Sequence, residues 1–206
     1  MSTLRNATQS GESSTPMKIG ILAIQGDYEA HARVLNQLGS DYVYVRTPAD
    51  LEGINGLILP GGESTTHLKV MTEEGLLDAI KRFAANGGAF FGTCAGAILL
   101  AREVHGPDQS SLGLIDIAVQ RNGYGRQLAS DVRSAQTKLN PEPLEMVFIR
   151  APIIQTVGPG VEILAQDDGH PVIVKQGRIL VTTFHPELTS STTVHEHFLK
   201  MLRNGS

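Results

Sequence analysis

The chain has 206 residues, 41% of them hydrophobic and 18% charged, and a formal net charge of −4 at pH 7. This composition is typical of a globular protein with a substantial core and excludes a disordered chain. The negative charge gives no basis for binding nucleic acid or an anionic membrane, and no apolar run approaches the length of a membrane span.

The first sixteen residues differ from the rest, because they are polar and rich in serine and threonine. They lack the apolar segment of a secretory signal, so we predict a disordered leader or an artificial extension over residues 1–16. One domain is expected over residues 17–206, and Met17 is a candidate natural start. The single cysteine, Cys94, cannot form an internal disulfide, which fits the reducing cytoplasm.

Strands and helices alternate in the first half of the chain. Apolar runs predict strands at residues 17–25, 41–46, 56–59 and 89–91, and helical spacing predicts helices at 28–38, 72–86 and 97–102. Asp27 is a candidate cap for the first helix. This order predicts an α/β fold, with a doubly wound, mostly parallel central sheet and flanking helices, as in flavodoxin-like three-layer proteins.

The second half has shorter alternating runs, which predict additional, mostly antiparallel strands. They lie at residues 115–120, 145–150, 161–165, 171–175 and 179–184, before a terminal helix at 192–202. Ligands of parallel sheets bind at the carboxyl ends of the strands. Three loops are expected at that edge, at residues 25–26, 60–64 and 92–96.

Cys94 lies in the segment Gly-Thr-Cys-Ala-Gly, between an apolar strand and a helix. This is the form of a nucleophile elbow, in which a sharp turn presents a reactive side chain and flanking glycines allow close packing. The alternative is a small buried hydrophobic residue, as most free cysteines are. From this segment alone both interpretations stay open.

A cysteine nucleophile needs a base and an orienting group. His185 ends an apolar run and begins His-Pro-Glu, so Glu187 can lie beside it on an extended segment. The alternative is an ordinary surface turn. The other histidines are weaker candidates: His31 and His67 lie in helical stretches with no evident acidic partner, and His195 and His197 point apart on a helix, which argues against a metal site.

Acyl transfer also needs donors for an oxyanion. In an elbow one donor is the backbone N–H after the nucleophile, here that of Ala95. Gly61 and Gly62 follow another strand and can bring a bare backbone N–H close to a ligand. A plain turn is the alternative for this glycine pair.

Together these segments resemble the class I (triad) glutamine amidotransferases, and more narrowly the glutaminase subunit of the ribose-5-phosphate-dependent pyridoxal 5′-phosphate synthases. The matching motifs lie in family order at residues 21–26, 57–66, 91–96, 120–127, 147–152 and 184–189. The Cys and His-Pro-Glu motifs belong to the whole class. Pro-Gly-Gly-Glu-Ser-Thr-Thr and Phe-Ile-Arg-Ala-Pro select the vitamin B6 branch. Residues 122–124 depart from it with Asn-Gly-Tyr in place of Asn-Ser-Phe.

The resemblance implies hydrolysis of glutamine to glutamate and ammonia through a glutamyl thioester. Cys94 would be the nucleophile, His185 the base and Glu187 its orienting group, with Gly62 and Ala95 supplying the oxyanion hole. The family pattern also implies that a further set of residues contacts the substrate glutamine: Gly62, Glu63, Ser64, Arg121, Ile149 and Arg150.

The resemblance further implies a partner that uses the ammonia. This is a separate synthase subunit, a (β/α)8 barrel, which forms a dodecameric core that glutaminase subunits decorate. Family members are poorly active alone, because the oxyanion loop needs the partner to set a peptide orientation. Gly61 and Gly62 suit such a change, and the loop at residues 25–26 with its neighbouring helix is a candidate docking surface. No cofactor or metal is expected here, since the coenzyme is made in the partner.

Three rival interpretations remain. A stand-alone cysteine hydrolase of the same fold, such as a γ-glutamyl hydrolase-like enzyme, would lack the two narrow motifs. A non-enzymatic relative is disfavoured because all three triad positions are filled. A glutaminase of histidine or purine synthesis is disfavoured by the same narrow motifs.

Overall fold

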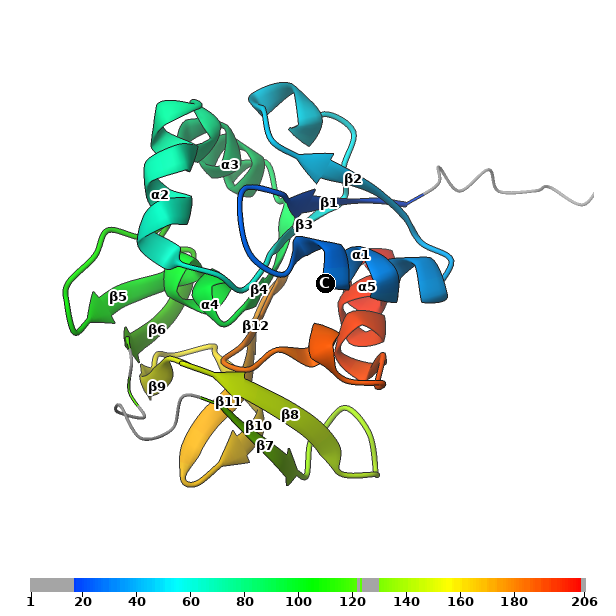
Figure 1. Ribbon diagram of the computed structural model, residues 1–206, viewed down its shortest axis with the longest axis vertical. Helices are drawn as coiled ribbons and strands as arrows, with labels where there is room; N and C mark the ends of the chain where they lie inside the picture. The colour runs from blue at the N-terminus through cyan, green and yellow to red at the C-terminus, as the bar shows by residue number, and fades with distance from the viewer. Residues whose placement is uncertain (1–16, 122, 124–129, 205–206) are drawn as a thin grey trace, which may run out of the picture.

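A computed structural model describes residues 17–121, 123 and 130–204. Its centre is a seven-stranded sheet with strand order β10-β11-β12-β4-β3-β1-β2 (Figure 1). The five strands from β12 to β2 pair in parallel, and β11 and β10 continue the sheet antiparallel. The fold is therefore the predicted doubly wound α/β sheet. The predicted leader at residues 1–16 lies outside the described residues, and the single domain stays a prediction.

The parallel half follows the predicted alternation closely. Its strands and helices are β1 (Lys18–Leu22), α1 (Tyr28–Gln37), β2 (Asp41–Val45), β3 (Gly56–Leu59), α2 (Ser64–Glu73), α3 (Leu76–Ala85), β4 (Ala89–Thr93) and α4 (Ala95–Leu100). A short 3-10 helix, η1 (Pro48–Leu51), precedes β3. Figure 1 shows α2 and α3 on one side of the sheet and α1 with α5 (Thr193–Asn204) on the other.

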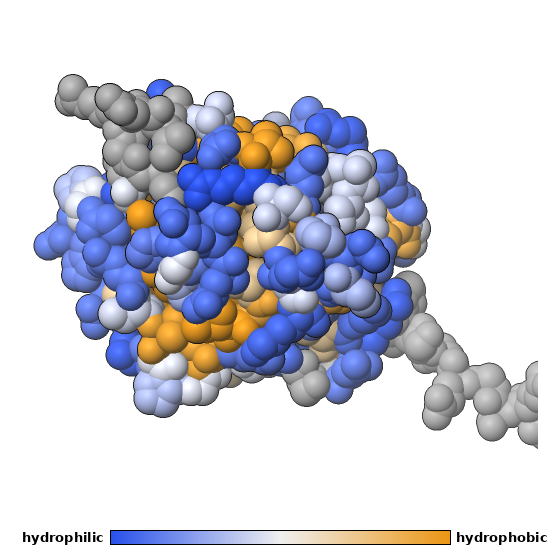
Figure 2. Space-filling model, turned by 90° about the horizontal axis from the view of Figure 1, so that it is seen from below, coloured by the Kyte–Doolittle hydropathy of each residue, from blue (hydrophilic) through white to orange (hydrophobic). Residues whose placement is uncertain are grey.

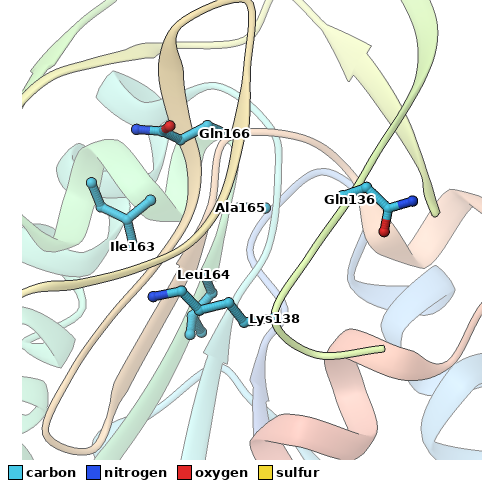
Figure 3. A pocket seen from close by; sticks show the side chains of 6 residues that line it. All are labelled: Gln136, Lys138, Ile163, Leu164, Ala165 and Gln166. Carbon is cyan, nitrogen blue, oxygen red and sulfur yellow. The ribbon is translucent and has the colours of Figure 1, made fainter. Parts of the chain in front are cut away.

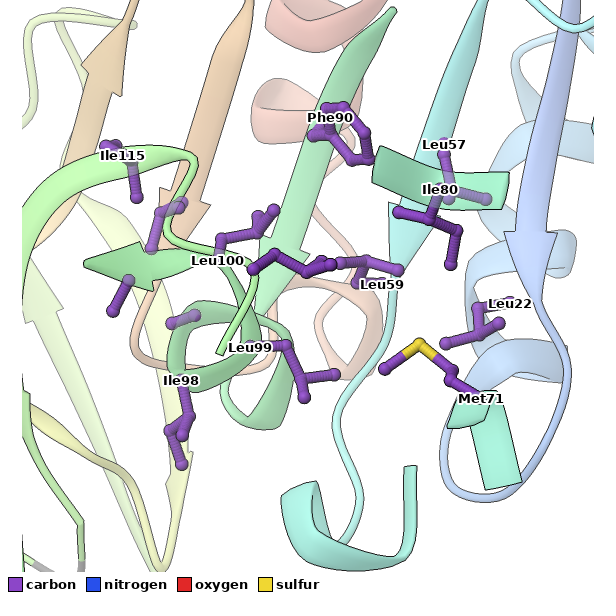
Figure 4. Packing of buried hydrophobic residues seen from close by; sticks show 14 of the residues in the cluster. Leu22, Leu57, Leu59, Met71, Ile80, Phe90, Ile98, Leu99, Leu100 and Ile115 are labelled. Atoms are coloured by element: carbon purple, nitrogen blue, oxygen red, sulfur yellow. The ribbon is translucent and has the colours of Figure 1, made fainter. Parts of the chain in front are cut away.

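The central strands are apolar throughout because both faces of the sheet are covered. Side chains alternate between two cores along each strand. On β3, Leu57 and Leu59 join the cluster under α2, α3 and α4 (Figure 4), whereas Ile58 joins the cluster under α1 and α5. On β4, Phe90 and Phe91 divide in the same way. This two-sided burial fixes the register of the strands and therefore the positions of the loops at their ends.

The rest of the chain builds the far end of the sheet and two smaller sheets. β10 (Glu162–Asp167), β11 (His170–Gln176) and β12 (Ile179–Thr182) extend the central sheet. The smaller sheets contain β5 (Ala101–His105), β6 (Ile115–Gln120) and β9 (Ile153–Val157), and the hairpin of β7 (Ser130–Ala135) with β8 (Leu144–Ile149). A second 3-10 helix, η2 (Pro186–Leu188), precedes α5.

Several predicted boundaries were wrong. The helix predicted at residues 72–86 is two helices, because Gly75 adopts a left-handed conformation (φ 70°) that ends one and starts the next. The helix predicted at 97–102 begins at Ala95 and gives way to β5. Strands β5 and β7 were missed, since their half-exposed, charged sequences lack a clear apolar run. β9 was missed because its short sequence, Ile-Ile-Gln-Thr-Val, neither alternates nor stays apolar throughout. β12 forms the expected antiparallel pair with β11, but it also pairs in parallel with β4 and so joins the central sheet.

The surface seen in Figure 2 is mostly hydrophilic, with small apolar groups between the polar ones. Among the described residues, the large hydrophobic side chains that are more than a third exposed are Val132, Ile149 and Leu188. Within the same residues, no helix combines the length and the apolar character needed to cross a membrane.

Phe198 allows a test of how α5 is held on the sheet. Its ring is fully buried and lies 5.5 Å, centroid to centroid, from the ring of Phe91. We expect Phe198→Ala to lower the free energy of unfolding by about 3–5 kcal/mol, through lost burial and the cavity left behind. Urea unfolding followed by circular dichroism measures this. Val132→Ala, at a 61% exposed position, is the control and should change stability by less than about 0.5 kcal/mol.

Candidate active site

A cleft of about 460 Å³ lies at the carboxyl ends of β1, β3, β4 and β12. Nine of the ten predicted site residues line it, and the tenth, Glu187, lies buried nearby. The lining residues are Gln25, Asp27, Gly62, Glu63, Ser64, Cys94, Ala95, Ile98, Arg121, Ile149, Arg150 and His185. A second hollow, between β10 and the segment after β7, holds no nucleophile or histidine (Figure 3). The predicted catalytic and substrate-binding residues therefore lie in or beside the first cleft.

Cys94 occupies a tight elbow between β4 and α4. Its backbone has φ 48° and ψ −100°, a conformation that a residue with a side chain rarely adopts. The elbow is held from both sides: the Cys94 N–H donates to the Thr182 carbonyl (3.0 Å), and a Cβ at Gly96 would lie 2.0 Å from the Leu59 carbonyl oxygen. Only glycine at position 96 lets α4 pack this close to β3. The Cys94 Sγ lies 3.7 Å from the carbonyl oxygen of Ile149.

His185 and Glu187 form the predicted pair. His185 Nδ1 lies 2.8 Å from Glu187 Oε1, and both side chains are buried. The His185 backbone N–H donates to the Val147 carbonyl of β8 (2.8 Å), which fixes the strand end. With Nδ1 bound to a carboxylate, Nε2 is the ring atom available to the thiol of Cys94.

Asp27 occupies the N-cap position of α1, as predicted, but its side chain does not cap the helix. Its carboxylate makes no capping hydrogen bond, and Oδ2 lies 3.3 Å from His185 Nδ1, so His185 has two carboxylate neighbours. Burial lowers the pKa of His185, but hydrogen bonds with Asp27, Cys94 and Glu187 outweigh burial and raise the pKa above its usual range. This environment favours the imidazolium form of His185.

Gly61, the first residue of the glycine pair, lies against the imidazole of His185. A Cβ at Gly61 would lie 2.2 Å from His185 Cε1, so any side chain there would displace the histidine. The loop is tied to the segment after β1, because the Asp27 N–H donates to the Gly61 carbonyl (3.3 Å) and the Glu63 N–H donates to Gln25 Oε1 (3.0 Å). The two loops therefore form one unit over the cleft.

Glu63 caps α2 with its side chain. The carboxylate accepts hydrogen bonds from the backbone N–H of Thr66 (2.8 Å) and Thr65 (3.3 Å) and from both threonine hydroxyls, and Arg121 lies 3.3 Å away. Hydrogen bonds from Thr65 and Thr66 lower the pKa of Glu63 to about 2 despite partial burial. Glu63 is therefore a fixed negative charge at the cleft, with Arg121 beside it.

The remaining predicted contacts surround the mouth of the cleft. Ser64 is buried, and its hydroxyl donates to Gln109 Oε1 (2.9 Å), a residue that sequence reasoning did not single out. Ile149 ends β8, and Arg150 follows it with φ 46°. Residues 122 and 124, where the sequence departs from the family motif, lie outside the described residues.

Two histidines that the sequence analysis set aside lie directly behind the pair. His31 of α1 places Nε2 at 3.5 Å from Glu187 Oε2 and at 3.2 Å from the Thr93 hydroxyl, so the expectation that His31 has no acidic partner was wrong. His195 of α5 places Nε2 at 2.9 Å from His31 Nδ1. No local signal could have found these contacts, because the residues come from α1, α5 and η2.

One group of described residues has a spacing that a metal ion could use: Asp27, His185 and Glu187, whose ligand atoms lie within 4.8 Å of one another. The 2.8 Å separation of Nδ1 and Oε1 is that of a hydrogen bond. A metal on Nδ1 would displace the proton that orients His185. Metal binding and the orientation of His185 therefore exclude each other at these atoms.

The sheet, the cysteine elbow and the histidine-carboxylate pair together define the class I glutamine amidotransferase fold. A solved structure described as a glutamine amidotransferase is 43% identical and superposes with a TM-score of 0.85, covering 90% of this chain and 98% of that one. The structure of PurLQS from Thermotoga maritima shares the fold at 17% identity, with a TM-score of 0.71 over 91% of this chain and 99% of that chain.

The chain belongs to the SNO glutamine amidotransferase family, whose model matches residues 21–204. A relative from Koribacter versatilis, named pyridoxal 5′-phosphate synthase subunit PdxT, is 54% identical over 92% of this chain and 98% of its own length. A relative of the same name from Deinococcus radiodurans is 50% identical over 89% of this chain and 96% of its own length.

The backbone of the elbow makes a testable prediction. In an ordinary helix, glycine is less stable than alanine by about 1 kcal/mol. At position 94 the order should reverse, with Cys94→Gly more stable than Cys94→Ala by about 1 kcal/mol, because glycine adopts φ 48° without a steric cost. Paired urea unfolding curves measure the difference. A more stable alanine variant would contradict a strained elbow.

Proposed function

We propose that this protein hydrolyses L-glutamine to L-glutamate and ammonia, as the glutaminase subunit of a pyridoxal 5′-phosphate synthase. The observation that carries the proposal is that Cys94, His185 and Glu187 lie together, all buried, beside an open cleft. Nδ1 of His185 lies 2.8 Å from the carboxylate of Glu187. A nucleophile, a base and an orienting carboxylate in this arrangement are the requirements of covalent acyl transfer.

The three side chains have distinct roles in the proposed cycle, and His185 acts in both of its halves. The Cys94 thiolate attacks the side-chain amide carbon of glutamine, and His185 holds the thiol proton as imidazolium. His185 then protonates the departing nitrogen, so that ammonia leaves and a glutamyl thioester remains. Water, deprotonated by His185, attacks the thioester and releases glutamate, which regenerates the thiolate. Glu187 keeps Nδ1 protonated and offsets the positive charge of the ring.

The tetrahedral oxyanion would be held by the backbone N–H groups of Ala95 and Gly62. Ala95 is the residue after the nucleophile, where an elbow supplies its first donor. Gly62 lies on the loop tied to Gln25 and Asp27, so its peptide orientation depends on that loop. The proposal includes a partner protein whose binding sets the orientation of the Gly62 peptide and so completes the oxyanion hole.

Glutamine would bind across the same cleft. Glu63 offers a fixed negative charge to the α-ammonium group, and Arg121 and Arg150 offer positive charge to the α-carboxylate. Ser64, Gly62 and Ile149 complete the proposed contacts. No cofactor or metal has a role in this scheme, which uses only side chains and backbone N–H groups.

The ammonia would pass to a synthase subunit, as the name of the PdxT relatives supports. The finer expectation is a (β/α)8 barrel in a dodecameric core that carries these glutaminase subunits, so that ammonia moves between proteins without release. The cytoplasmic location also stays a prediction, supported by the single unpaired thiol. The loop at residues 25–26 and α1 remain the proposed docking surface.

Loss of either reacting group should abolish the reaction. We expect Cys94→Ala and His185→Asn to reduce glutamate release at least about 10³-fold, because each removes a group that takes part in bond making. Glutamate measured by a coupled dehydrogenase assay, with synthase subunit present, reports the loss. Unchanged circular dichroism serves as the folding control, and normal turnover by Cys94→Ala would disprove the mechanism.

Activity should depend on the partner. We expect glutaminase turnover to rise at least about ten-fold when the synthase subunit from the same source is added, since ordering one oxyanion donor is worth about 10²-fold or more. Titration of the synthase subunit at saturating glutamine measures this. Equal turnover in its presence and absence would contradict a vitamin B6 complex but would leave the triad chemistry intact.

A further inference from the structure

We propose that His31, held in one tautomer by His195, is a positioning residue that keeps Glu187 charged and oriented toward His185. The inference rests on the proposed function, because it assigns a role in the same reaction. It extends the pair of His185 and Glu187 into a buried line of four side chains. The line joins η2 to α1 and α5, which lie together on one side of the sheet (Figure 1).

The first observation is the far oxygen of Glu187. Oε1 is bound to His185, whereas Oε2 is fully buried and has no well-aligned hydrogen bond among the described residues. His31 Nε2, at 3.5 Å, is the ring nitrogen that faces it. A buried carboxylate oxygen without a donor is costly, and a donor nearby stabilises its charge. His31 is in position to be that donor.

The second observation is that the hydrogen bonds favour one set of tautomers. If His31 carries its proton on Nε2, it faces Glu187 Oε2 and the Thr93 hydroxyl, and Nδ1 accepts a proton from His195 Nε2 at 2.9 Å. His195 Nδ1 is then a bare lone pair, and it has no partner in the described structure. The Phe91 ring, whose centroid lies 5.3 Å from that of the His195 ring, is an apolar neighbour that suits an uncharged His195.

The opposite set of tautomers fits poorly. A proton on His31 Nδ1 would point at His195 Nε2, which would place the other proton of the pair on His195 Nδ1, where it is buried without an acceptor. The lone pair of His31 Nε2 could then accept from the Thr93 hydroxyl at 3.2 Å, but it would also face the carboxylate oxygen of Glu187 at 3.5 Å. The first set of tautomers leaves only the Nδ1 lone pair of His195 unused. The second set buries an N–H of His195 without an acceptor and places the lone pair of His31 Nε2 against that of Glu187 Oε2.

Both histidines must also stay neutral. Burial lowers the pKa of His195 to about 3, and burial, with His195 and His185 nearby, lowers the pKa of His31 well below its usual range. The titratable groups that face Glu187 are His185 from its own segment, Asp27 from the loop before α1 and His31 from α1. Cys94 faces His185 from the elbow. His31 therefore acts as a neutral donor.

Removing the His31 N–H should shift the pKa of Glu187 in a defined direction. Burial already raises the pKa of Glu187 despite its hydrogen bond with His185, and loss of the His31 N–H raises it further. Glu187 then stays protonated, and therefore neutral, up to a higher pH than in wild type. The imidazolium of His185 loses the stabilisation that a charged Glu187 gives it. The thiolate of Cys94 therefore forms less readily. The acid limb of the reaction therefore moves to higher pH and the basic limb to lower pH.

The test compares three variants in the complex with the synthase subunit. We expect His31→Leu to lower kcat by about ten- to a hundred-fold near pH 7, to change KM little, and to narrow the pH profile from both sides. His31→Gln should regain most of the activity, because its amide N–H can replace Nε2–H. His197→Leu, on α5 but outside the line, is the matched control and should behave as wild type.

A second readout does not depend on glutaminase activity. The rate at which iodoacetamide alkylates Cys94 reports the thiolate, and its acid limb should move to higher pH by at least about half a unit in His31→Leu but not in His31→Gln. If wild type releases no glutamate while this shift occurs, the proposed function fails and the inference stands. An unshifted alkylation profile in a folded His31→Leu overturns the inference alone.

The tautomers can be read without any substitution. Long-range ¹H–¹⁵N correlation spectra of labelled wild-type protein distinguish Nδ1–H from Nε2–H in each ring. We expect Nε2–H on both His31 and His195, with both rings uncharged at neutral pH and His195 still uncharged at pH 5. This measurement decides the matter even where His31→Leu fails to fold. A proton on His31 Nδ1, or a charged His31 at neutral pH, overturns the proposal.

Discussion

The site depends on the parallel pairing of β4 with β12. In this register Thr93 lies opposite Thr182, so the chain leaves both strands at the same edge of the sheet. The hydrogen bond from the Cys94 N–H to the Thr182 carbonyl continues the pairing by one residue beyond β4. Cys94 and His185, ninety-one positions apart in the sequence, are thereby mounted on adjacent rigid supports. A slip of one residue in either strand would turn every side chain to the opposite face and separate them.

The other side of the sheet supplies an environment for one buried carboxylate. Glu187 is shielded from solvent by α1 and α5, and groups on both helices line up behind it. A charge in such a place persists only where donors surround it. The helices therefore cover the apolar face of the sheet and also set the electrostatic conditions for His185. The same side chains therefore pack these helices on the sheet and stabilise the charge of Glu187.

The sequence allowed a good prediction of the central strands and of the site motifs, both of which carry a clear local pattern. The strands at the centre of the sheet read as apolar runs because both faces are covered, and the elbow and the His-Pro-Glu segment carry short motifs. The contacts of His31 with Glu187 were not predictable, since they depend on which helix covers which face. Asp27 was misread because its position before α1 is that of a cap, and the competing attraction of His185 comes from a residue far along the chain.

Glu63 ties the shape of the cleft to the stability of a helix. Its carboxylate holds the first turn of α2 and at the same time stands at the mouth beside Arg121. The geometry of that charge is therefore set during folding, before any ligand arrives, and little reorganisation is left for the moment of encounter. This double role limits which residues can replace Glu63, because one side chain would have to cap the N-terminus of α2 and also present a negative charge at the mouth of the cleft.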